Sequence, residues 1–396
     1  MFPVSSLRSQ FPVLNAIREG RSPIFLDGPG GTQVPQQVID AIVHYLRTCN
    51  ANHGGVFRTS RESDAIVHAA HEAVADLLNA PSVEEIVFGP NMTTLTFHLS
   101  RAIGRTLKPG DEVLVTRLDH DANVSPWGLT ARDAGATVKR VDIHPEDCTL
   151  DMEDFKKQLG SRTRLVALTC ASNGVGTVND VKTLTRLAHE VGAWVFLDAV
   201  HYAPHGLIDV QDWGCDFLAC SAYKFFGPHI GILWGKRKLL AELPAYKVRP
   251  SSNALPDRWM TGTQNHECLA GVAAAVDYLA QIEAGSGSAS RRARLCSAMS
   301  AIRSYERARG STVGRVGATP PIQSVGHHHA SSARPARPDC FHYRARSARS
   351  SNRGAFGVPG DLHLERQHVR PGTDGTTRLG GEGRLAADRN GSLQHD

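Results

Sequence analysis

Short apolar segments alternate with helical segments between about residues 60 and 235, and this alternation constrains the fold more than any other feature of the chain. Near-continuous apolar strands separated by helices are typical of a mostly parallel sheet that helices cover on both faces. The sequence therefore predicts an α/β fold. The expected strands are 85–88, 112–116, 137–141, 165–170, 193–197, 217–220 and 231–234.

Four segments have the spacing of apolar residues that is typical of helices. They are 64–78, 181–191, 268–283 and 291–307. We expect Asn179 to cap the second of them, because a short polar side chain before a helix accepts a hydrogen bond from its first turn. In parallel α/β sheets, functional residues lie just past the carboxyl ends of the strands. Polar residues at those positions are therefore the candidates for a site.

The composition excludes several classes of protein. The chain has 396 residues, enough for a large core and two domains, and a formal net charge of only +5, too small and scattered to indicate a nucleic-acid partner. No segment approaches the roughly 18 apolar residues of a membrane span, and the first residues lack a signal-peptide pattern. Eight cysteines without a CxxC pair predict reduced thiols. We expect a cytoplasmic protein that binds neither nucleic acid nor membrane.

Two of the predicted strands end in polar residues that could act together. The segment W-V-F-L-D-A-V-H places Asp198 after one strand, and D-F-L-A-C-S-A-Y-K places Ser221, Tyr223 and Lys224 after the next. Pyridoxal-phosphate (PLP) chemistry needs such a pair: a lysine that holds the cofactor and moves protons, and a carboxylate that keeps the pyridine nitrogen protonated. On spacing alone, a structural salt bridge is the commoner explanation.

The residues around this pair resemble a known family. D-A-V-H and S-A-Y-K-F-F-G-P-H-I-G-I-L-W-G are together similar to the class V aminotransferase and cysteine desulfurase family of fold-type I, PLP-dependent enzymes. Four more segments resemble family motifs in the family's chain order, which argues against coincidence over residues 20–307. They are F-L-D-G-P-G-G-T-Q (25–33), L-D-H-D-A-N-V-S-P-W (118–127), A-S-N-G-V-G-T-V-N (171–179) and T-G-T-Q-N (261–265).

The resemblance implies a role for each residue that matches a motif. Lys224 would form the Schiff base with PLP, Asp198 would pair with the pyridine nitrogen, and His120 would stack on the ring face. Asn173 and His201 would hydrogen-bond the phenolic oxygen of the ring. Many relatives have glutamine at the position of His201, and both side chains can donate. The alternative for His120 is an ordinary polar loop residue.

The resemblance also predicts how the cofactor phosphate is bound. Ser221 and Tyr223 would reach it, although relatives often have histidine at the Tyr223 position. Backbone N–H groups at a helix N-terminus would add donors, here in G-P-N-M-T-T with Met92 and Thr93, where an asparagine replaces the family's glycine. Thr263 would contact the phosphate of the neighbouring subunit in a homodimer. The alternative for Thr263 is a simple turn threonine.

The expected domains are an N-terminal segment (1–30), a PLP-binding large domain (31–265), connecting helices (266–307) and an anomalous tail (308–396). The tail contains thirteen arginines and no lysine, and it lacks helical or strand periodicity. Members of the family end in a small α/β domain that supplies an arginine for the substrate carboxylate. The tail resembles nothing of that kind, so we expect the small domain to be missing or disordered.

A shift of reading frame would explain this tail. When the segment from Gly360 to Arg378 is back-translated and read one base out of frame, it can encode a string with strand and helix character that resembles the last domain of a desulfurase-like subgroup. We therefore hypothesise a frameshift near Arg307. The histidine run 327–329 has no carboxylate or cysteine at ligand spacing, so we expect no metal site. The arginines around Arg344 accompany no nucleic-acid-binding module.

Two functions follow from these observations. The first is a PLP-dependent enzyme that acts on an amino acid through Lys224, by desulfurase or lyase chemistry, amino transfer or a related reaction. The alternative is a catalytically impaired, PLP-binding remnant produced by the frameshift. A Rossmann-type nucleotide binder is disfavoured, because no GxGxxG motif follows a first strand.

Overall fold

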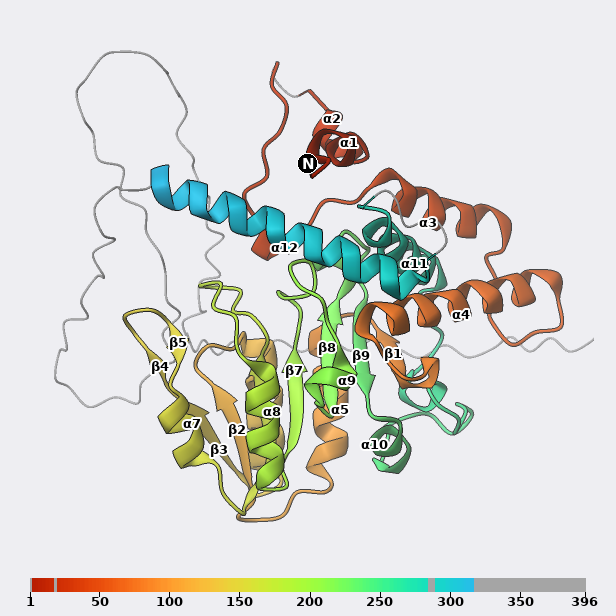
Figure 1. The fold of residues 1–396 in the computed structure, drawn as a ribbon. Helices are drawn as coiled ribbons and strands as arrows, with labels where there is room; N and C mark the ends of the chain where they lie inside the picture. Colours follow the sequence, from red (N-terminus) through yellow and green to blue (C-terminus); the bar gives the residue numbers. More distant parts are fainter. Residues whose placement is uncertain (1, 18–19, 284–288, 317–396) are drawn as a thin grey trace, which may run out of the picture. The chain divides into compact units, whose positions relative to one another are not determined.

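A seven-stranded sheet forms the centre of the computed structural model, which describes residues 2–17, 20–283 and 289–316 (Figure 1). The strand order is β1-β9-β8-β7-β6-β2-β3. The strands from β8 to β3 run parallel, whereas β9 is antiparallel to both of its neighbours. The bounds are β1 (Ile86–Gly89), β2 (Glu112–Thr116), β3 (Thr137–Val141), β6 (Thr163–Thr169), β7 (Trp194–Asp198), β8 (Phe217–Ser221) and β9 (Gly231–Gly235).

All seven predicted strands are present, each within two residues of its expected bounds, and the mostly parallel sheet is confirmed. A separate two-stranded ribbon, β4 (Ile143–His144) with β5 (Thr149–Leu150), was not predicted from the sequence. Strands of two residues are too short to show an alternating pattern.

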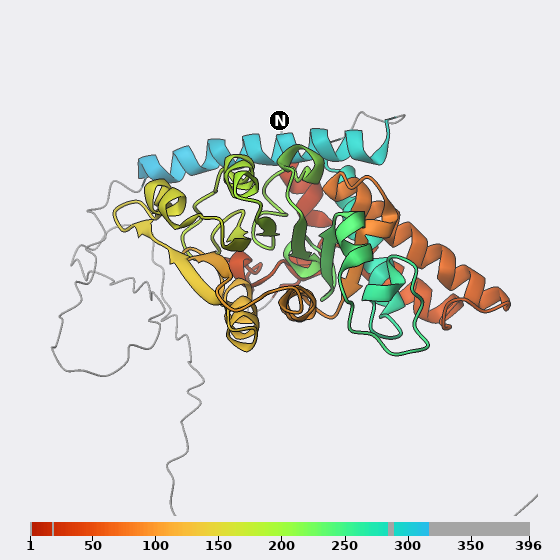
Figure 2. The same ribbon diagram turned by 90° about the horizontal axis from the view of Figure 1, so that it is seen from below.

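Helices cover both faces of the sheet, as Figures 1 and 2 show. Successive side chains of a strand point to opposite faces, and both faces are apolar here: Val195 and Leu197 belong to one hydrophobic cluster, and Phe196 belongs to the other. The first cluster includes side chains of α4, α7, α8, α11 and α12, and the second includes those of α5, α6 and α10. Burial on both faces accounts for the continuous apolar strands of the sequence.

Twelve α-helices lie in the described part of the chain. Their bounds are α1 (Val4–Ser9), α2 (Pro12–Asn15), α3 (Gln36–Thr48), α4 (Arg58–Leu78), α5 (Met92–Gly104), α6 (Ser125–Asp133), α7 (Met152–Gln158), α8 (Val181–Glu190), α9 (Val210–Trp213), α10 (Arg237–Glu242), α11 (His266–Ala280) and α12 (Arg291–Val316). The four predicted helices are confirmed as α4, α8, α11 and α12. Helix α4 begins before residue 64. Helix α12 continues past 307 to Val316, so the start of the segment that was expected to be an anomalous tail is helical.

The predicted cap of α8 is wrong by one residue. Asp180, not Asn179, accepts a hydrogen bond from the backbone N–H of Thr183, at 3.2 Å. The Asn179 side chain is used elsewhere: its Nδ2 donates to the carbonyl of Thr169 at 2.8 Å and ties the loop back to the end of β6. Sequence alone could not separate two adjacent residues that are both good N-caps.

The N-terminal segment packs on later parts of the chain. Phe2 stacks on Tyr305 of α12 with ring centroids 4.7 Å apart, and Phe11 makes edge-to-face contacts with Phe226 and Tyr278. Helix α12 also contacts the loop that follows β7, where His205 and Glu306 form an ion pair of 2.8 Å. Both ends of the described chain therefore contact segments that follow the central strands.

The described residues belong to one compact unit, Met1–Pro321. No helix within them is both long and apolar enough to cross a membrane. The predictions made for the tail from residue 317 onward, including its disorder, the histidine run and the arginines, lie outside the described residues.

Candidate active site

The polar residues that follow β7 and β8 lie at one edge of the sheet, because these neighbouring strands run parallel. The alternation of side chains also places them on one face. Phe196 and Ala219 contribute to the hydrophobic cluster of α5 and α6, so Asp198 and Ser221, two residues further along their strands, point toward the same side. The chain thus directs a carboxylate and a hydroxyl toward the face that α5 covers.

Asp198 is buried and only partly satisfied by hydrogen bonds. Its side chain is 4% exposed, and the backbone N–H of Val200 donates to Oδ1 at 2.8 Å. No described residue donates to Oδ2. Burial raises the pKa of Asp198 to about 6, while the nearby charges of His120 and Lys224 act to lower it. Three residues that the sequence placed in the site are therefore within electrostatic reach of one another.

Lys224 ends a single helical turn, Ala222–Lys224, directly after β8. It is 8% exposed, and its Nζ donates to the carbonyl of Pro29. Burial lowers the pKa of the Lys224 amine, and the Asp198 carboxylate acts in the opposite direction. A lowered pKa makes the neutral, nucleophilic form of a lysine accessible nearer to neutral pH.

The segment before α3 covers Lys224, and the sequence analysis gave its residues no role in the site. Thr32 donates both its N–H and its hydroxyl to the carbonyl of Tyr223, each at 2.9 Å, and accepts from the N–H of Phe226 at 2.8 Å. A side chain at Gly31 would meet the Tyr223 ring at 3.1 Å, and its φ of +151° also favours glycine. The Tyr223 ring stacks on His229, 5.1 Å between centroids.

The N-terminus of α5 offers backbone donors. Asn91 caps the helix by accepting from the N–H and the hydroxyl of Thr94, at 2.8 and 2.9 Å. The N–H groups of Met92 and Thr93 have no hydrogen-bond partner among the described residues, and the Met92 side chain is buried, so only its backbone is available. A Cβ at Gly231 would lie 2.2 Å from the Asn91 carbonyl carbon, so β9 needs glycine there for α5 to start in this place.

His120 lies in the exposed turn between β2 and α6. Its Nδ1 accepts from the N–H of Ala122 at 3.0 Å. Because an accepting ring nitrogen carries no proton, the neutral imidazole holds its proton on Nε2.

Asp119, beside His120, is a site residue that the sequence analysis missed. Its carboxylate accepts hydrogen bonds from Thr116 and Asn123. Burial raises the pKa of Asp119 to about 7, and the charge of Asp198 raises it further, against the effect of these hydrogen bonds. Asp119 stands next to His120 in the segment 118–127, which resembles a family motif, and this position was the one available signal for an acidic residue here.

The other predicted site residues differ in how exposed they are. His201 is half-buried; burial lowers its pKa, and the neighbouring His205 and Lys224 lower it further. Ser221 is 2% exposed, and its hydroxyl has no partner in the described ranges. Asn173 is exposed in the loop after β6. Thr263 is exposed in the segment before α11.

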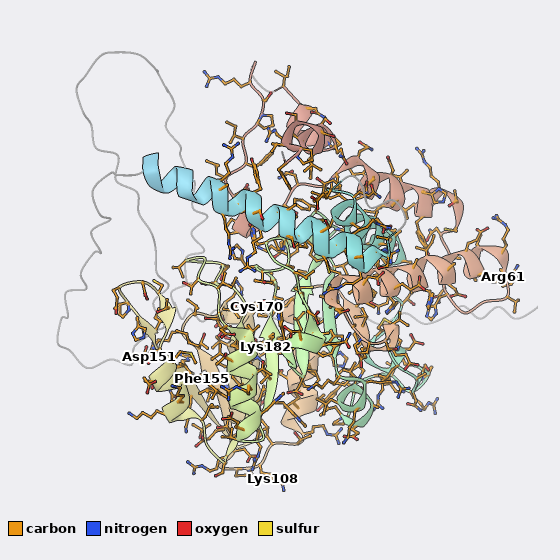
Figure 3. All side chains as sticks on the ribbon, viewed as in Figure 1. Arg61, Lys108, Asp151, Phe155, Cys170 and Lys182 are labelled. Carbon is orange, nitrogen blue, oxygen red and sulfur yellow. The ribbon has the colours of Figure 1, made fainter. Side chains whose placement is uncertain are left out.

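The three buried cysteines in or next to β6 and β8 are poor nucleophiles. Cys170, labelled in Figure 3, directly follows β6 and is 1% exposed. Burial raises the pKa of its thiol well above the usual range, and the carboxylate of Asp198 adds to this effect. Burial likewise raises the pKa of Cys215 and Cys220. The reactive form of cysteine is the thiolate, so these three are structural.

The residues present fit PLP. The open Oδ2 of Asp198 can accept from a protonated ring nitrogen, and the uncapped N–H groups at the start of α5 suit a phosphate. The buried amine of Lys224 lies in electrostatic contact with the same carboxylate. The comparisons decide the family: the model for "Aminotransferase class-V" matches residues 24–331. The chain belongs to the class V aminotransferase family.

Curated relatives and solved structures agree with this membership. A cysteine desulfurase of Pectobacterium carotovorum is 35% identical over 293 residues, which cover 70% of this chain and 72% of the relative. An aminotransferase-like protein of Gibberella zeae, FGM3, is 39% identical over 250 residues, 61% of this chain and 60% of the relative. The structure of the Escherichia coli cysteine desulfurase CsdA matches with a TM-score of 0.68 and 26% identity, covering 81% and 79% of the two chains.

This family of enzymes uses PLP, so the predictions of fold-type I, of the cofactor and of a PLP-dependent enzyme are confirmed. The family match reaches residue 331, past Arg307, where the sequence analysis placed the end of the resemblance.

Proposed function

We propose that this enzyme acts on an amino acid, with Lys224 carrying the cofactor and Asp198 holding its ring nitrogen. The observation that supports this assignment is the pair itself: a buried lysine and a buried carboxylate with one oxygen open, at the carboxyl ends of adjacent strands. PLP, when bound, withdraws electrons from the Cα of an amino-acid substrate. The residues of this chain supply the proton transfers, orientation and charge.

Asp198 would supply negative charge at the ring nitrogen, and Lys224 would transfer protons. Asp198 must be ionised to hold a positive charge at the ring nitrogen. Burial raises the pKa of Asp198 to about 6, so the side chain is a carboxylate only when the pH is above that value. Lys224 has its pKa lowered by burial, so its neutral Nζ can accept the proton that leaves the substrate Cα. His120, with its proton on Nε2, would lie flat on the ring and fix its plane.

The remaining predicted residues orient the cofactor. The N–H groups of Met92 and Thr93, with the hydroxyls of Thr93, Ser221 and Tyr223, would hold the phosphate. Asn173 and His201 would donate to the phenolic oxygen. We propose further that the enzyme is a cytoplasmic homodimer, in which Thr263 reaches the phosphate of the other subunit. The exposure of Thr263 is consistent with a contact across the dimer.

Either amino transfer or lyase chemistry suits this site. Sulfur transfer would need an accessible thiol: Cys170, Cys215 and Cys220 are buried, whereas Cys148, Cys268 and Cys296 are partly exposed. Incubation with a panel of amino acids, with assays for keto acid and for sulfide, separates the two reactions.

The frameshift near Arg307 remains part of this proposal. Restoring the alternative frame after Arg307 should add the substrate-binding small domain, and turnover should rise with it. Sequencing the gene downstream of this codon tests the proposal: the alternative frame should encode the small α/β domain, and stop codons that interrupt that frame rule it out. An enzyme impaired by the frameshift would bind PLP but turn over slowly.

Reduction with borohydride tests the role of Lys224. The purified enzyme should carry PLP with visible absorbance, and reduction should leave the cofactor on the peptide that contains Lys224. Lys182→Ala is the control, because that lysine forms a surface ion pair with Asp212 and should not affect labelling. Reduced cofactor on any other lysine contradicts the assignment.

A further inference from the structure

Asp119 holds the end of β2 and the turn of His120 together. Its Oδ2 accepts from both the N–H and the hydroxyl of Thr116, at 3.1 and 2.5 Å. Its Oδ1 accepts from Nδ2 of Asn123 at 2.8 Å. The hydroxyl of Thr116 also accepts from the N–H of Leu118 at 3.1 Å, which closes the turn. One carboxylate therefore joins the residues on either side of His120.

The direction of these hydrogen bonds is fixed by a buried indole. Nε1 of Trp127 donates to Oδ1 of Asn123 at 3.1 Å, and Trp127 is 1% exposed. An indole can only donate, so this oxygen of Asn123 must be the acceptor and its Nδ2 must be the donor. The atom at position 119 that faces Nδ2 must then accept. An amide at position 119 would satisfy Thr116 with its oxygen and present N–H groups to Asn123, two donors face to face.

The same carboxylate lies near Asp198. The charge of Asp198, at the end of β7, raises the pKa of Asp119, and the charge of Asp119 in turn raises the pKa of the Cys170 thiol after β6. His120 follows Asp119 directly in the chain. Trp127, the anchor of the network, makes an edge-to-face contact with Phe196 of β7, 5.2 Å between centroids. The turn of His120 and the strand of Asp198 are thus packed on one another through this network.

We propose that Asp119 is a positioning residue of the PLP site, which fixes the turn of His120 and adds a second negative charge behind Asp198. This inference rests on the proposed roles of Asp198 and Lys224. A protonated ring nitrogen beside Asp198 would lie in the field of two carboxylates, and the protonated form of the cofactor–lysine linkage would gain from the same charge. The three donors around Asp119 favour its ionised form, against the effect of burial.

The proposed role of Asp119 predicts how PLP binding depends on pH. Burial raises the pKa of Asp119 to about 7, so lowering the pH through that value removes the second negative charge. PLP should then bind more weakly on the acidic side of neutrality. The dependence should be shallower in a variant that has no ionisable group at position 119.

Asp119→Asn tests the proposal, with Asp121→Asn as the matched control. Asp121 lies in the same turn and is exposed, and its carboxylate hydrogen-bonds only Ser125 among the described residues, so its substitution removes an equal charge without touching the network. Two quantities are measured: the dissociation constant for PLP, and the pH midpoint of the visible absorbance of the bound cofactor. We expect Asp119→Asn to weaken binding roughly tenfold and to move the midpoint down by about one pH unit. Asp121→Asn should leave both unchanged.

Asp119→Glu separates charge from fold. A glutamate keeps the carboxylate, so the midpoint should return toward that of the wild type even if the longer side chain weakens binding. A midpoint in Asp119→Asn equal to that of the wild type, or an equal shift in Asp119→Asn and Asp119→Glu, overturns the role of Asp119. Failure of the proposed function gives a different result, because the wild type itself would then carry no cofactor on Lys224.

Discussion

The sheet carries a buried aspartate with a lysine at each of its two ends, and the two pairs are built differently. At the end opposite the site, Asp216 precedes β8 and is 4% exposed. Its carboxylate takes part in three hydrogen bonds: with Lys236 at 2.7 Å, with His189 at 2.8 Å and with the N–H of Val195 at 2.8 Å. Both oxygens are used. Asp198 has a single backbone donor and leaves one oxygen open.

The electrostatics of the two aspartates differ in the same way. Burial acts to raise the pKa of Asp216, but the bonds from His189 and Lys236 outweigh it and the pKa is lowered. Burial dominates at Asp198 and raises its pKa to about 6. The structural salt bridge that spacing alone would assign to Asp198 and Lys224 is thus found at Asp216 and Lys236. A satisfied pair holds the fold, whereas an open pair is available to bind a ligand.

The largest expected effect is the loss of covalently bound PLP, which should follow substitution of Lys224 but not of Lys236. Lys224→Ala should abolish covalent attachment of PLP and its visible absorbance, because no other amine lies beside Asp198 among the described residues. Lys236→Ala should keep the absorbance and lose stability. Absorbance spectra and thermal unfolding of both variants make the measurement. Normal attachment of PLP in Lys224→Ala would show that the two pairs have been assigned the wrong way round.

The sequence could predict which strand ends carry polar residues, but not which pair would be satisfied. Asp198 and Lys224 follow apolar strands and stand in family motifs, so pattern alone finds them. The partners of Asp216 come from the end of α8 and from the end of the antiparallel strand β9, and Pro29 reaches Lys224 across 195 positions of the chain. Those contacts depend on tertiary packing, which short-range periodicity does not encode. Asp119 was missed for the same reason: its importance comes from Trp127 and Asp198.

The next largest effect concerns the free energy of unfolding. Asp216→Ala leaves the buried N–H of Val195 without its acceptor and removes one of the two acceptors of Lys236, which is partly exposed and keeps the carbonyl of Gly214. The variant should lose about 3 kcal/mol of unfolding free energy. The contribution of Asp216 is present above the unfolded pKa of an aspartate and is lost as the pH falls through the lowered folded value. Denaturant unfolding of the cofactor-free protein makes the measurement, and PLP should still bind. A loss of unfolding free energy as small as that of a surface substitution would show that Asp216 does not stabilise the fold.

Asp198→Asn should increase the unfolding free energy of the cofactor-free protein above neutral pH, whereas Asp216→Ala lowers it. A raised pKa means that Asp198 contributes stability below its unfolded pKa, and that this contribution disappears as the pH rises through about 6. A shift of this size corresponds to about 3 kcal/mol, which water in an open site reduces to about 2 kcal/mol. The variant should therefore be the more stable protein at about pH 8, while binding PLP poorly. Unfolding curves at about pH 4.5 and 8 test the sign; a variant less stable than the wild type at the higher pH would contradict it.

The smallest effect compares two helix caps. Asn91 caps α5 at the site and Asp180 caps α8 on the other face of the sheet, each with a side-chain oxygen that accepts from the third N–H of its helix. Replacement of either residue by alanine should cost about 1 kcal/mol in unfolding free energy. Only Asn91→Ala should also weaken PLP binding, by a few-fold, because the first turn of α5 then holds the N–H groups of Met92 and Thr93 less rigidly toward the phosphate. Titration of both variants with PLP and with inorganic phosphate makes the measurement. If both variants bind PLP as the wild type does, the start of α5 is not the phosphate site, and the caps of α5 and α8 differ in no functional respect.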